Sequence, residues 1–418
     1  MKIKKKALNF NLILYLIGRM VSDTGSSIQM MIMPLYIIDI GGTAGTIGLL
    51  GFFSFLPTLM IYPFAGVIGD RLNRKSIMVV TDLISAGVIL ILASISYLDM
   101  VNIALLLVVQ VIISLLNGLF EPATRGMLPH LVDKDDITRA NSTLASLRSV
   151  SIMLGPVIGA ALYANLGITI VFLVNGISFL FSGISEMMIQ YRHKKIDTVW
   201  GIGGIFNDLS EGIRYIISNK MISKLCLFLL FNYLVIQPIF SMILPLFFKN
   251  SLEYSDVQYG YLQMIIIIGA LIGSLLVGGL LGKSEKLRSP LMGGSIIVSS
   301  TMIMSVVLML PWSIAALGNN SPIYFITLAG VLCLLSIANT FIIVPIQSYI
   351  QKKTLNQYMS RVFSLVGLIT RGGITLGALA YGFILEKVAM HWTLMVATVL
   401  MIIFSIGFAA ILFKNNEI

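Results

Sequence analysis

Twelve apolar stretches, each about as long as a membrane-spanning helix, follow one another along the chain. A helix that crosses a bilayer needs about 20 predominantly apolar residues, and in lipid its backbone must satisfy its own hydrogen bonds. A transmembrane β-barrel would instead show shorter segments of alternating hydrophobicity. We therefore expect an all-α membrane protein with twelve transmembrane helices, at about residues 8–38, 46–68, 76–97, 102–123, 141–164, 168–190, 222–248, 258–282, 290–311, 322–348, 362–385 and 391–413.

The composition leaves no room for a soluble domain of ordinary size. Of the 418 residues, 57% are hydrophobic and 11% are charged, whereas soluble domains contain about 25% charged residues. Cys226 and Cys333 lie in apolar stretches, where thiols pack as small hydrophobic groups. The sequence shows no catalytic constellation, and Gly282-Lys283-Ser284 lacks the first glycine of a phosphate loop. We expect neither an enzyme nor a bound cofactor or metal.

The cations are distributed unevenly between the loops. Two of the 28 Lys and Arg residues lie in one set of alternating loops, three lie inside spans, and the rest lie at the termini or in the other set of loops. The two cations in the poorly charged set of loops are Lys249 and Lys387. The three inside spans are Arg19, Arg148 and Arg371. Because Lys and Arg are enriched in cytoplasmic loops, we expect both termini to be cytoplasmic in a bacterial-type plasma membrane. The net charge of +10 then reflects orientation rather than binding to nucleic acid.

A polar stretch divides the spans into two sets of six. It contains the run Arg192-His193-Lys194-Lys195, followed by Phe206, Leu209, Ile213 and Ile216 at helical spacing. Such spacing is typical of a helix that lies at the membrane surface. We expect an amino-terminal six-helix bundle at 1–191, a cytoplasmic linker with an amphipathic helix at 192–221, and a carboxyl-terminal six-helix bundle at 222–418.

A short repeat relates the two halves. A proline is followed by two arginines, with gaps of 17 and 9 residues in the first half and 16 and 10 in the second. The residues are Pro122, Arg139 and Arg148 in the first half and Pro345, Arg361 and Arg371 in the second. Secondary transporters are commonly built from internal repeats, so the spacing favours two pseudo-symmetric bundles.

The loop between the second and third spans carries the sharpest motif. It reads Gly66-Val-Ile-Gly-Asp70-Arg71-Leu-Asn73-Arg74-Lys75 and resembles the signature loop of the major facilitator superfamily, G-x-L-A-D-R-x-G-R-K. The resemblance implies that Asp70 and the three cations form a charged gate on the cytoplasmic side. Asn73 replaces a glycine, and asparagine tolerates the positive φ of such a turn. Alternatively, the cations serve only to orient the protein.

A second motif lies in the fifth span. The segment Ser151-Ile-Met-Leu-Gly155-Pro156-Val-Ile-Gly159-Ala160 resembles the antiporter motif of the same superfamily, G-x-x-x-G-P-x-x-G-G, with Ser and Ala in place of the outer glycines. Pro156 cannot donate a helix hydrogen bond, and Gly155 and Gly159 let another helix approach closely. The resemblance implies an exporter. The alternative is ordinary packing of small residues.

Three further segments resemble a narrower branch, which contains the bacterial macrolide efflux proteins and the enterobactin exporters. They are Phe120-Glu-Pro-Ala-Thr-Arg-Gly-Met-Leu-Pro-His-Leu-Val132, Asp208-Leu-Ser-Glu-Gly-Ile-Arg-Tyr215 and Ser360-Arg-Val-Phe-Ser364. The fourth span departs from many proton-coupled drug exporters, because it has Gln110, Asn117 and Gly118 but no arginine. The resemblance therefore supports export more directly than it supports proton coupling.

Four ionisable side chains are expected inside the membrane, where a charge costs about 2.5 to 3.5 kcal/mol at the centre of a helix. They are Arg19, Asp23, Arg148 and Arg371. Arg19 and Asp23 stand four residues apart on one helix face and are within pairing distance. This pair either exchanges a proton for a substrate contact or has a static structural role.

Arg148 and Arg371 have no acidic neighbour in their own helices. With one aspartate against three arginines, the interior would carry an excess of positive charge and would favour an anionic substrate. Alternatively, an acid near a cytoplasmic span end pairs with these arginines or with the cations of the signature loop. The candidate acids are Asp82, Glu121 and Glu186.

Six amide side chains stand alone in apolar stretches and are candidates to line a substrate cavity. They are Gln29, Asn117, Asn232, Gln237, Asn339 and Gln347. Such groups also form hydrogen bonds between helices, which is the alternative role.

These observations predict a secondary active exporter that works by alternating access. We expect it to exchange a small amphiphilic molecule, such as a macrolide-like drug or another antimicrobial, for protons, with the proton gradient as its energy source and no cofactor. The alternatives are an exporter of siderophores, metallophores or other anionic metabolites, and a non-transporting or lipid-handling membrane protein. We expect the substrate and the lipid bilayer to be its partners, and the protein to be a monomer.

Overall fold

The computed structural model describes the backbone of residues 2–71, 73–133, 136–191, 202–281, 287–355 and 358–414. Within these ranges it does not describe the side chains of residues 2–9, 62–71, 137–139, 202–209, 281, 360 and 411–414. Every regular element in the described part of the chain is a helix. The expected all-α fold is therefore confirmed.

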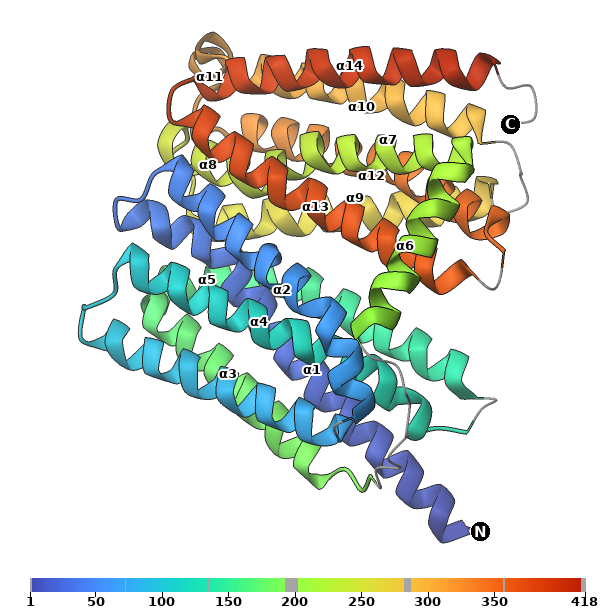
Figure 1. Cartoon of the computed structure of the whole chain (residues 1–418). Helices are drawn as coiled ribbons and strands as arrows, with labels where there is room; N and C mark the ends of the chain where they lie inside the picture. Colours follow the sequence, from blue (N-terminus) through green and yellow to red (C-terminus); the bar gives the residue numbers. More distant parts are fainter. Residues whose placement is uncertain are drawn as a thin grey trace. The chain divides into compact units, whose positions relative to one another are not determined.

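The helices follow one another with short connections (Figure 1). Their bounds are α1 Lys2–Asp39, α2 Ala44–Arg71, α3 Arg74–Tyr97, α4 Ile103–Met127, α5 Ile137–Met188, α6 Ile202–Ser218, α7 Lys220–Pro238, α8 Leu244–Ser251, α9 Asp256–Leu281, α10 Arg288–Leu308, α11 Pro311–Leu317, α12 Pro322–Lys353, α13 Met359–Leu385 and α14 Met390–Lys414. A 3₁₀ turn at Leu128–His130 follows α4, and a π-helical turn at Ile239–Ile243 joins α7 to α8.

Ten helical segments among the described residues are long and apolar enough to cross a membrane. One of them, Ala140–Met188, has 49 residues, more than twice the length of about 20 that a crossing requires. It lies in α5, whose helical path is interrupted at Gly167, where φ is 78° and ψ is 178°. Because only glycine adopts this conformation readily, Gly167 separates the two spans expected at 141–164 and 168–190. Helix α1, with Arg19 and Asp23 near its middle, is not among the ten, so the count of twelve stays a prediction.

Contacts divide the chain into two compact units. The first contains Met1–Gly42 and Phe52–Phe206, and the second contains Thr43–Gly51 and Asn207–Ile418. The boundary after Phe206 falls in the segment that the sequence indicates to be a linker. The start of α2 packs with the second unit, which hydropathy does not reveal.

The first unit is organised around α5. Helices α1 and α3 both pack along α5, and α3 also packs against α4. Tyr15, Met78, Phe120 and Met127 belong to a core that α1, α3 and α4 share. This core holds the amino-terminal half of α1, which contains Tyr15, against α4. It thereby positions the polar groups described below.

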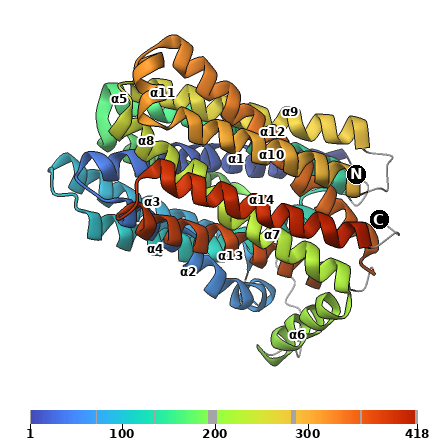
Figure 2. The ribbon, with the colours of Figure 1, turned by 90° about the horizontal axis from the view of Figure 1, so that it is seen from above.

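The second unit is organised around α12 and α13. Helices α9 and α10 pack against α12, as both views show (Figure 1 and Figure 2). Helix α7 packs against α13 through Gly373 and Gly377, where an added Cβ would lie 2.7 Å from the Leu230 oxygen and 2.5 Å from the Leu234 oxygen. These two glycines, which follow Arg371 in the sequence, therefore allow two helix backbones to meet.

Candidate functional site

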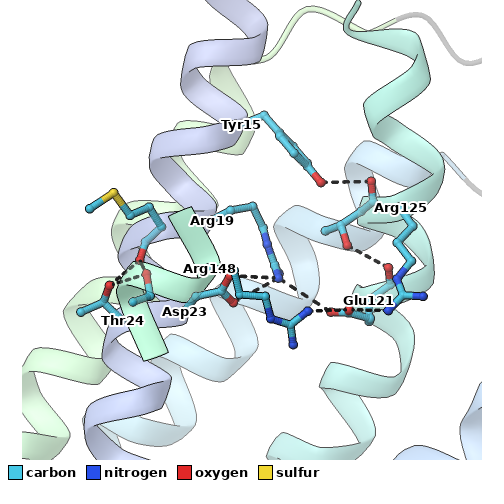
Figure 3. Close-up of polar contacts among 10 residues, drawn as sticks. Tyr15, Arg19, Asp23, Thr24, Glu121, Arg125 and Arg148 are labelled. Atoms are coloured by element: carbon cyan, nitrogen blue, oxygen red, sulfur yellow. Dashed lines mark hydrogen bonds and ion pairs between the residues drawn. The ribbon is translucent and has the colours of Figure 1, made fainter. Parts of the chain in front are cut away.

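One face of α1 carries a row of polar side chains into the first unit (Figure 3). Tyr15, Arg19 and Asp23 are spaced four residues apart and therefore share this face. Arg19 is 5% exposed, and its Nη2 lies 3.1 Å from Asp23 Oδ1. The structure thus forms the ion pair that the four-residue spacing predicts.

Glu121 of α4 connects this pair to two further arginines (Figure 3). Its Oε2 lies 3.7 Å from Arg19 Nη2, and its Oε1 lies 3.0 Å from Arg125 Nη2 and 3.2 Å from Arg148 Nη1. One carboxylate therefore contacts cations from α1, α4 and α5. We call Arg19, Asp23, Glu121, Arg125 and Arg148 the charged cluster.

The charged cluster contains more acid than the sequence analysis assigned to the interior. The sequence predicts one acid, Asp23, against three arginines, whereas Glu121 also contacts Arg19 and Arg148 in the structure. The alternative that Glu121 pairs with Arg148 is therefore confirmed, whereas for Arg371 it stays a prediction. The five residues carry three cations and two anions, a formal excess of one positive charge.

The small residues of α5 hold Arg148 at this place. Ser151 Oγ lies 2.9 Å from Thr24 Oγ1 and donates to the Met20 carbonyl at 3.2 Å. An added Cβ on Gly155 would lie 2.1 Å from Ser27 Oγ, and one on Gly159 would lie 3.2 Å from the Ile28 carbonyl oxygen. The segment that resembles the antiporter motif is therefore the surface on which α5 packs against α1.

Two buried acids of the first unit complete the surroundings of Arg19. Asp82 of α3 is 2% exposed and Glu186 of α5 is 1% exposed. Each interacts electrostatically with Arg19. The sequence indicates these acids only as possible partners of arginines, because their helices are distant in sequence and only tertiary packing brings them to α1.

Arg371 occupies the place in the second half that corresponds to Arg148. It lies in α13 of the second unit, where its carbonyl oxygen accepts a hydrogen bond from Thr375 Oγ1 at 2.8 Å. The role of Arg371 stays a prediction.

The signature loop is described only in part. The side chains of Asp70 and Arg71 are not described, and Gly66 lies in the same stretch of α2, of which only the backbone is described. Arg74 Nη1 donates to the Gly126 carbonyl at 2.6 Å, and Lys75 Nζ donates to the Met187 carbonyl at 2.7 Å. The last two cations of the motif therefore bind carbonyl oxygens near the ends of α4 and α5.

The turn before α3 differs from the expected one. Asn73 has φ of −66° and caps α3, with its side-chain oxygen accepting from Lys75 N at 3.0 Å. The expectation of a positive φ at Asn73 is therefore wrong. An asparagine at a helix N-cap satisfies a backbone N–H that has no partner within the helix, and this role needs no left-handed backbone.

The six amides occupy different environments. Gln29 accepts a hydrogen bond from Asn175 Nδ2 at 2.6 Å, which joins α1 to α5. Asn232 is 1% exposed, and its side-chain atoms have no hydrogen-bond partner in the described part of the chain. The other four are at least partly exposed: Asn117, Gln237, Asn339 and Gln347. A cavity-lining role stays a prediction for all six.

The linker helix α6 docks within the second unit. Glu211 Oε2 forms an ion pair with Arg361 Nη1 of α13. The Tyr215 ring stacks on Tyr358 at 4.7 Å, and its hydroxyl donates to the Lys353 carbonyl at 3.3 Å. Two segments that resemble the macrolide efflux branch therefore meet here.

The chain is similar in sequence to known membrane transporters. The family model of the Major Facilitator Superfamily matches residues 15–368. Macrolide efflux protein A of Streptococcus pyogenes is 25% identical over 397 residues, which cover 92% of each chain. Multidrug efflux pump Tap of Mycolicibacterium fortuitum is 23% identical over 410 residues, which cover 94% of each chain.

Solved structures share the fold at low sequence identity. The nucleoside transporter NupG matches with a TM-score of 0.76 and 13% identity, over 98% of this chain and 100% of that one. A bacterial homologue of the iron transporter ferroportin in an inward-facing state matches with a TM-score of 0.73 and 15% identity, over 96% and 98%. These likenesses concern the fold alone.

Proposed function

We propose that the chain exports a small amphiphilic molecule in exchange for protons. The starting point is that the chain belongs to the Major Facilitator Superfamily. It is therefore a multi-pass membrane transporter rather than an enzyme. The substrate class is a macrolide-like drug or another antimicrobial. The observation that carries this proposal is the similarity to Macrolide efflux protein A over 92% of both chains. Alternating access in a bacterial plasma membrane, with both termini cytoplasmic and the protein monomeric, belongs to the same proposal.

The charged cluster supports an amphiphilic rather than an anionic substrate. The anionic alternative depended on arginines without acids, and Glu121 contacts both Arg19 and Arg148. Each ion pair reduces the charge that would attract an anion. Glu121 and Asp23 also supply negative groups that suit a protonated amine on an otherwise apolar molecule.

Export of an anionic metabolite, such as a catecholate siderophore, remains the second candidate. It is favoured by the exposure of two cations around one acid, since the side chains of Arg125 and Arg148 are 66% and 48% exposed. An anionic group could bind these exposed guanidinium groups without displacing Arg19.

The decisive experiment compares how cells accumulate a macrolide drug and an anionic siderophore. A bacterial host deficient in its own drug pumps would express the wild-type chain, the exposed-loop variant Glu253→Gln as a matched control, or no added protein. We expect the wild type and the control to lower the intracellular level of labelled erythromycin, and a protonophore to restore it. A decrease of enterobactin but not erythromycin would favour the anionic alternative. No decrease of either would contradict the exporter proposal.

A further inference from the structure

We propose that Asp82 and Glu186 together form a proton-binding site in the first unit, and that loss of its proton draws Arg19 away from Asp23 and Glu121. This inference rests on the proposed proton exchange and names the residues that carry the proton. Helical spacing alone suggests Asp23 for this role, whereas the contacts in the first unit favour the more deeply buried acids.

The burial of the two acids is the first observation. Asp82 is 2% exposed and Glu186 is 1% exposed. Asp82 Oδ2 and both Glu186 carboxylate oxygens have no hydrogen-bond partner among the described residues. An ionised carboxylate that is removed from water without hydrogen bonds is strongly disfavoured, and such a group usually takes up a proton instead. The surroundings of both acids therefore suit the protonated form.

The proximity of the two acids is the second observation. Asp82 and Glu186 interact electrostatically with each other, and the helices that carry them are in contact. An added Cβ on Gly183 of α5 would lie 3.5 Å from Asp82 Cβ. Two carboxylates that share a buried site cannot both ionise at ordinary cost, because like charges repel each other strongly there. The pair therefore holds at least one proton in the arrangement that the structure shows.

The charged groups around the pair come from three helices. Helix α1 supplies Tyr15, Arg19 and Asp23, all of which interact electrostatically with at least one of the two acids. Helix α4 supplies Glu121, which acts through Arg19. On α3, Lys75 donates to the carbonyl of Met187, the residue after Glu186. Arg19 is the buried cation in this set.

Arg19 has an unused donor that suits an ionised pair. Its Nη2 contacts Asp23 and Glu121, whereas its Nε is buried without a hydrogen-bond partner in the described structure. A carboxylate formed at Asp82 or Glu186 would be an anionic acceptor for this guanidinium. Arg19 can therefore be shared between two sets of acids, and the protonation of one set decides which of them holds it.

The proton cycle follows from this competition. When the pair releases one proton to water on the cytoplasmic side, one O–H bond breaks and a carboxylate remains, which attracts Arg19. Asp23 and Glu121 then lose part of their positive partner and can bind a cationic group of the substrate. A proton from the external side rebuilds the carboxyl group, and Arg19 returns to Asp23 and Glu121.

Infrared spectroscopy of the purified full-length protein in lipid nanodiscs at neutral pH tests the site without any substrate. We expect the wild type to show the carbonyl stretching band of a buried protonated carboxyl group. Asp82→Asn and Glu186→Gln should each remove or shift this band, whereas Glu253→Gln should leave it unchanged. If a variant fails to fold, carbon-13 labelling of aspartate or glutamate in the wild type still assigns the band. No such band, or a band that neither substitution affects, would overturn the proposal.

A transport measurement separates this inference from the proposed function. In inverted membrane vesicles with a proton gradient, erythromycin should cause proton efflux through the wild type, reported by acridine orange fluorescence. The double variant Asp82→Asn with Glu186→Gln should lose this signal and bind erythromycin more weakly than the wild type, because an uncharged pair leaves Arg19 with Asp23 and Glu121. A double variant that keeps the proton signal would overturn the site. Absence of the signal in the wild type would count against the proposed function, and the infrared result would then decide the site alone.

Discussion

Arg148 Nη1 lies 3.2 Å from Glu121 Oε1, and this contact joins the amino-terminal part of α5 to the carboxyl-terminal part of α4. The same oxygen lies 3.0 Å from Arg125 Nη2. Because the Arg148 side chain is 48% exposed while that of Glu121 is 16% exposed, the acid is the fixed member of the pair. Exposed ion pairs contribute only about 0 to 1 kcal/mol to stability, so Arg148 can leave Glu121 at little cost.

Replacing Glu121 by glutamine should destabilise the first unit. The substitution keeps the shape of the side chain but removes the charge that Arg19 and Arg148 contact. We expect the free energy of unfolding to fall by about 1 to 3 kcal/mol, as when a buried charged group loses a partner. Unfolding in mixed detergent micelles, followed by the circular dichroism of the helices, measures this change.

Arg125→Gln is the matched control for this prediction. It removes another contact of Glu121, but from a side chain that is 66% exposed. We expect a change of about 0 to 1 kcal/mol. Equal losses in the two variants would show that Glu121 does not hold the cluster together.

Replacing Gly155 by alanine should loosen the packing of α5 on α1. The new Cβ would lie 2.1 Å from Ser27 Oγ and 2.6 Å from Ser27 Cβ, so the helices must separate. Overpacking of this kind costs about 1 to 3 kcal/mol. The melting temperature in detergent should fall, and Ser27→Gly in the same chain should restore part of it.

Gly87→Ala is the matched control for Gly155→Ala. Gly87 lies in α3, and nothing stands within 4 Å of an added Cβ there. Alanine is a better helix former than glycine by about 1 kcal/mol, so this variant should be neutral or slightly stabilised. A loss as large as that of Gly155→Ala would contradict the assignment of the Gly155 effect to contact with Ser27, because an added Cβ at Gly87 meets nothing within 4 Å.

The fold was largely predictable because apolar length and helix content are local properties of the sequence. The gap expected between 164 and 168 contains Gly167, where α5 changes direction. The packing of Thr43–Gly51 within the second unit was not predictable. It depends on Gly48 meeting the backbone of α13 at Ala378 and Gly382, and hydropathy contains no information about such a contact.

The candidate site was predictable only where its members share a helix. Arg19 and Asp23 pair across one turn of α1, and helical spacing alone indicates this. Glu121 and Arg148 come from different helices, and the packing of Gly155 on Ser27 sets their alignment. For the same reason a single sequence does not identify Asp82 and Glu186 as neighbours.

Reversing the charge of Arg361 should weaken the docking of α6. Arg361→Glu places a carboxylate opposite Glu211, and the matching change Glu211→Arg in the same chain restores an ion pair. Both side chains are partly exposed, so we expect a coupling energy of about 0.2 to 1 kcal/mol between the two sites. Melting temperatures of the two single variants and the double variant measure it. A double variant less stable than either single variant would contradict the pairing.

Replacing Arg148 by alanine separates structure from transport. Because the side chain is 48% exposed and Glu121 keeps Arg19 and Arg125, insertion and melting temperature should stay close to those of the wild type. If Arg148 displaces the substrate from Glu121, its loss should slow substrate release, and erythromycin export should fall by about tenfold, which corresponds to about 1.4 kcal/mol; Arg148→Lys should keep part of it. Arg371→Ala tests the corresponding place in the second unit. Unchanged export of both erythromycin and enterobactin in the two alanine variants would exclude a substrate role for these arginines.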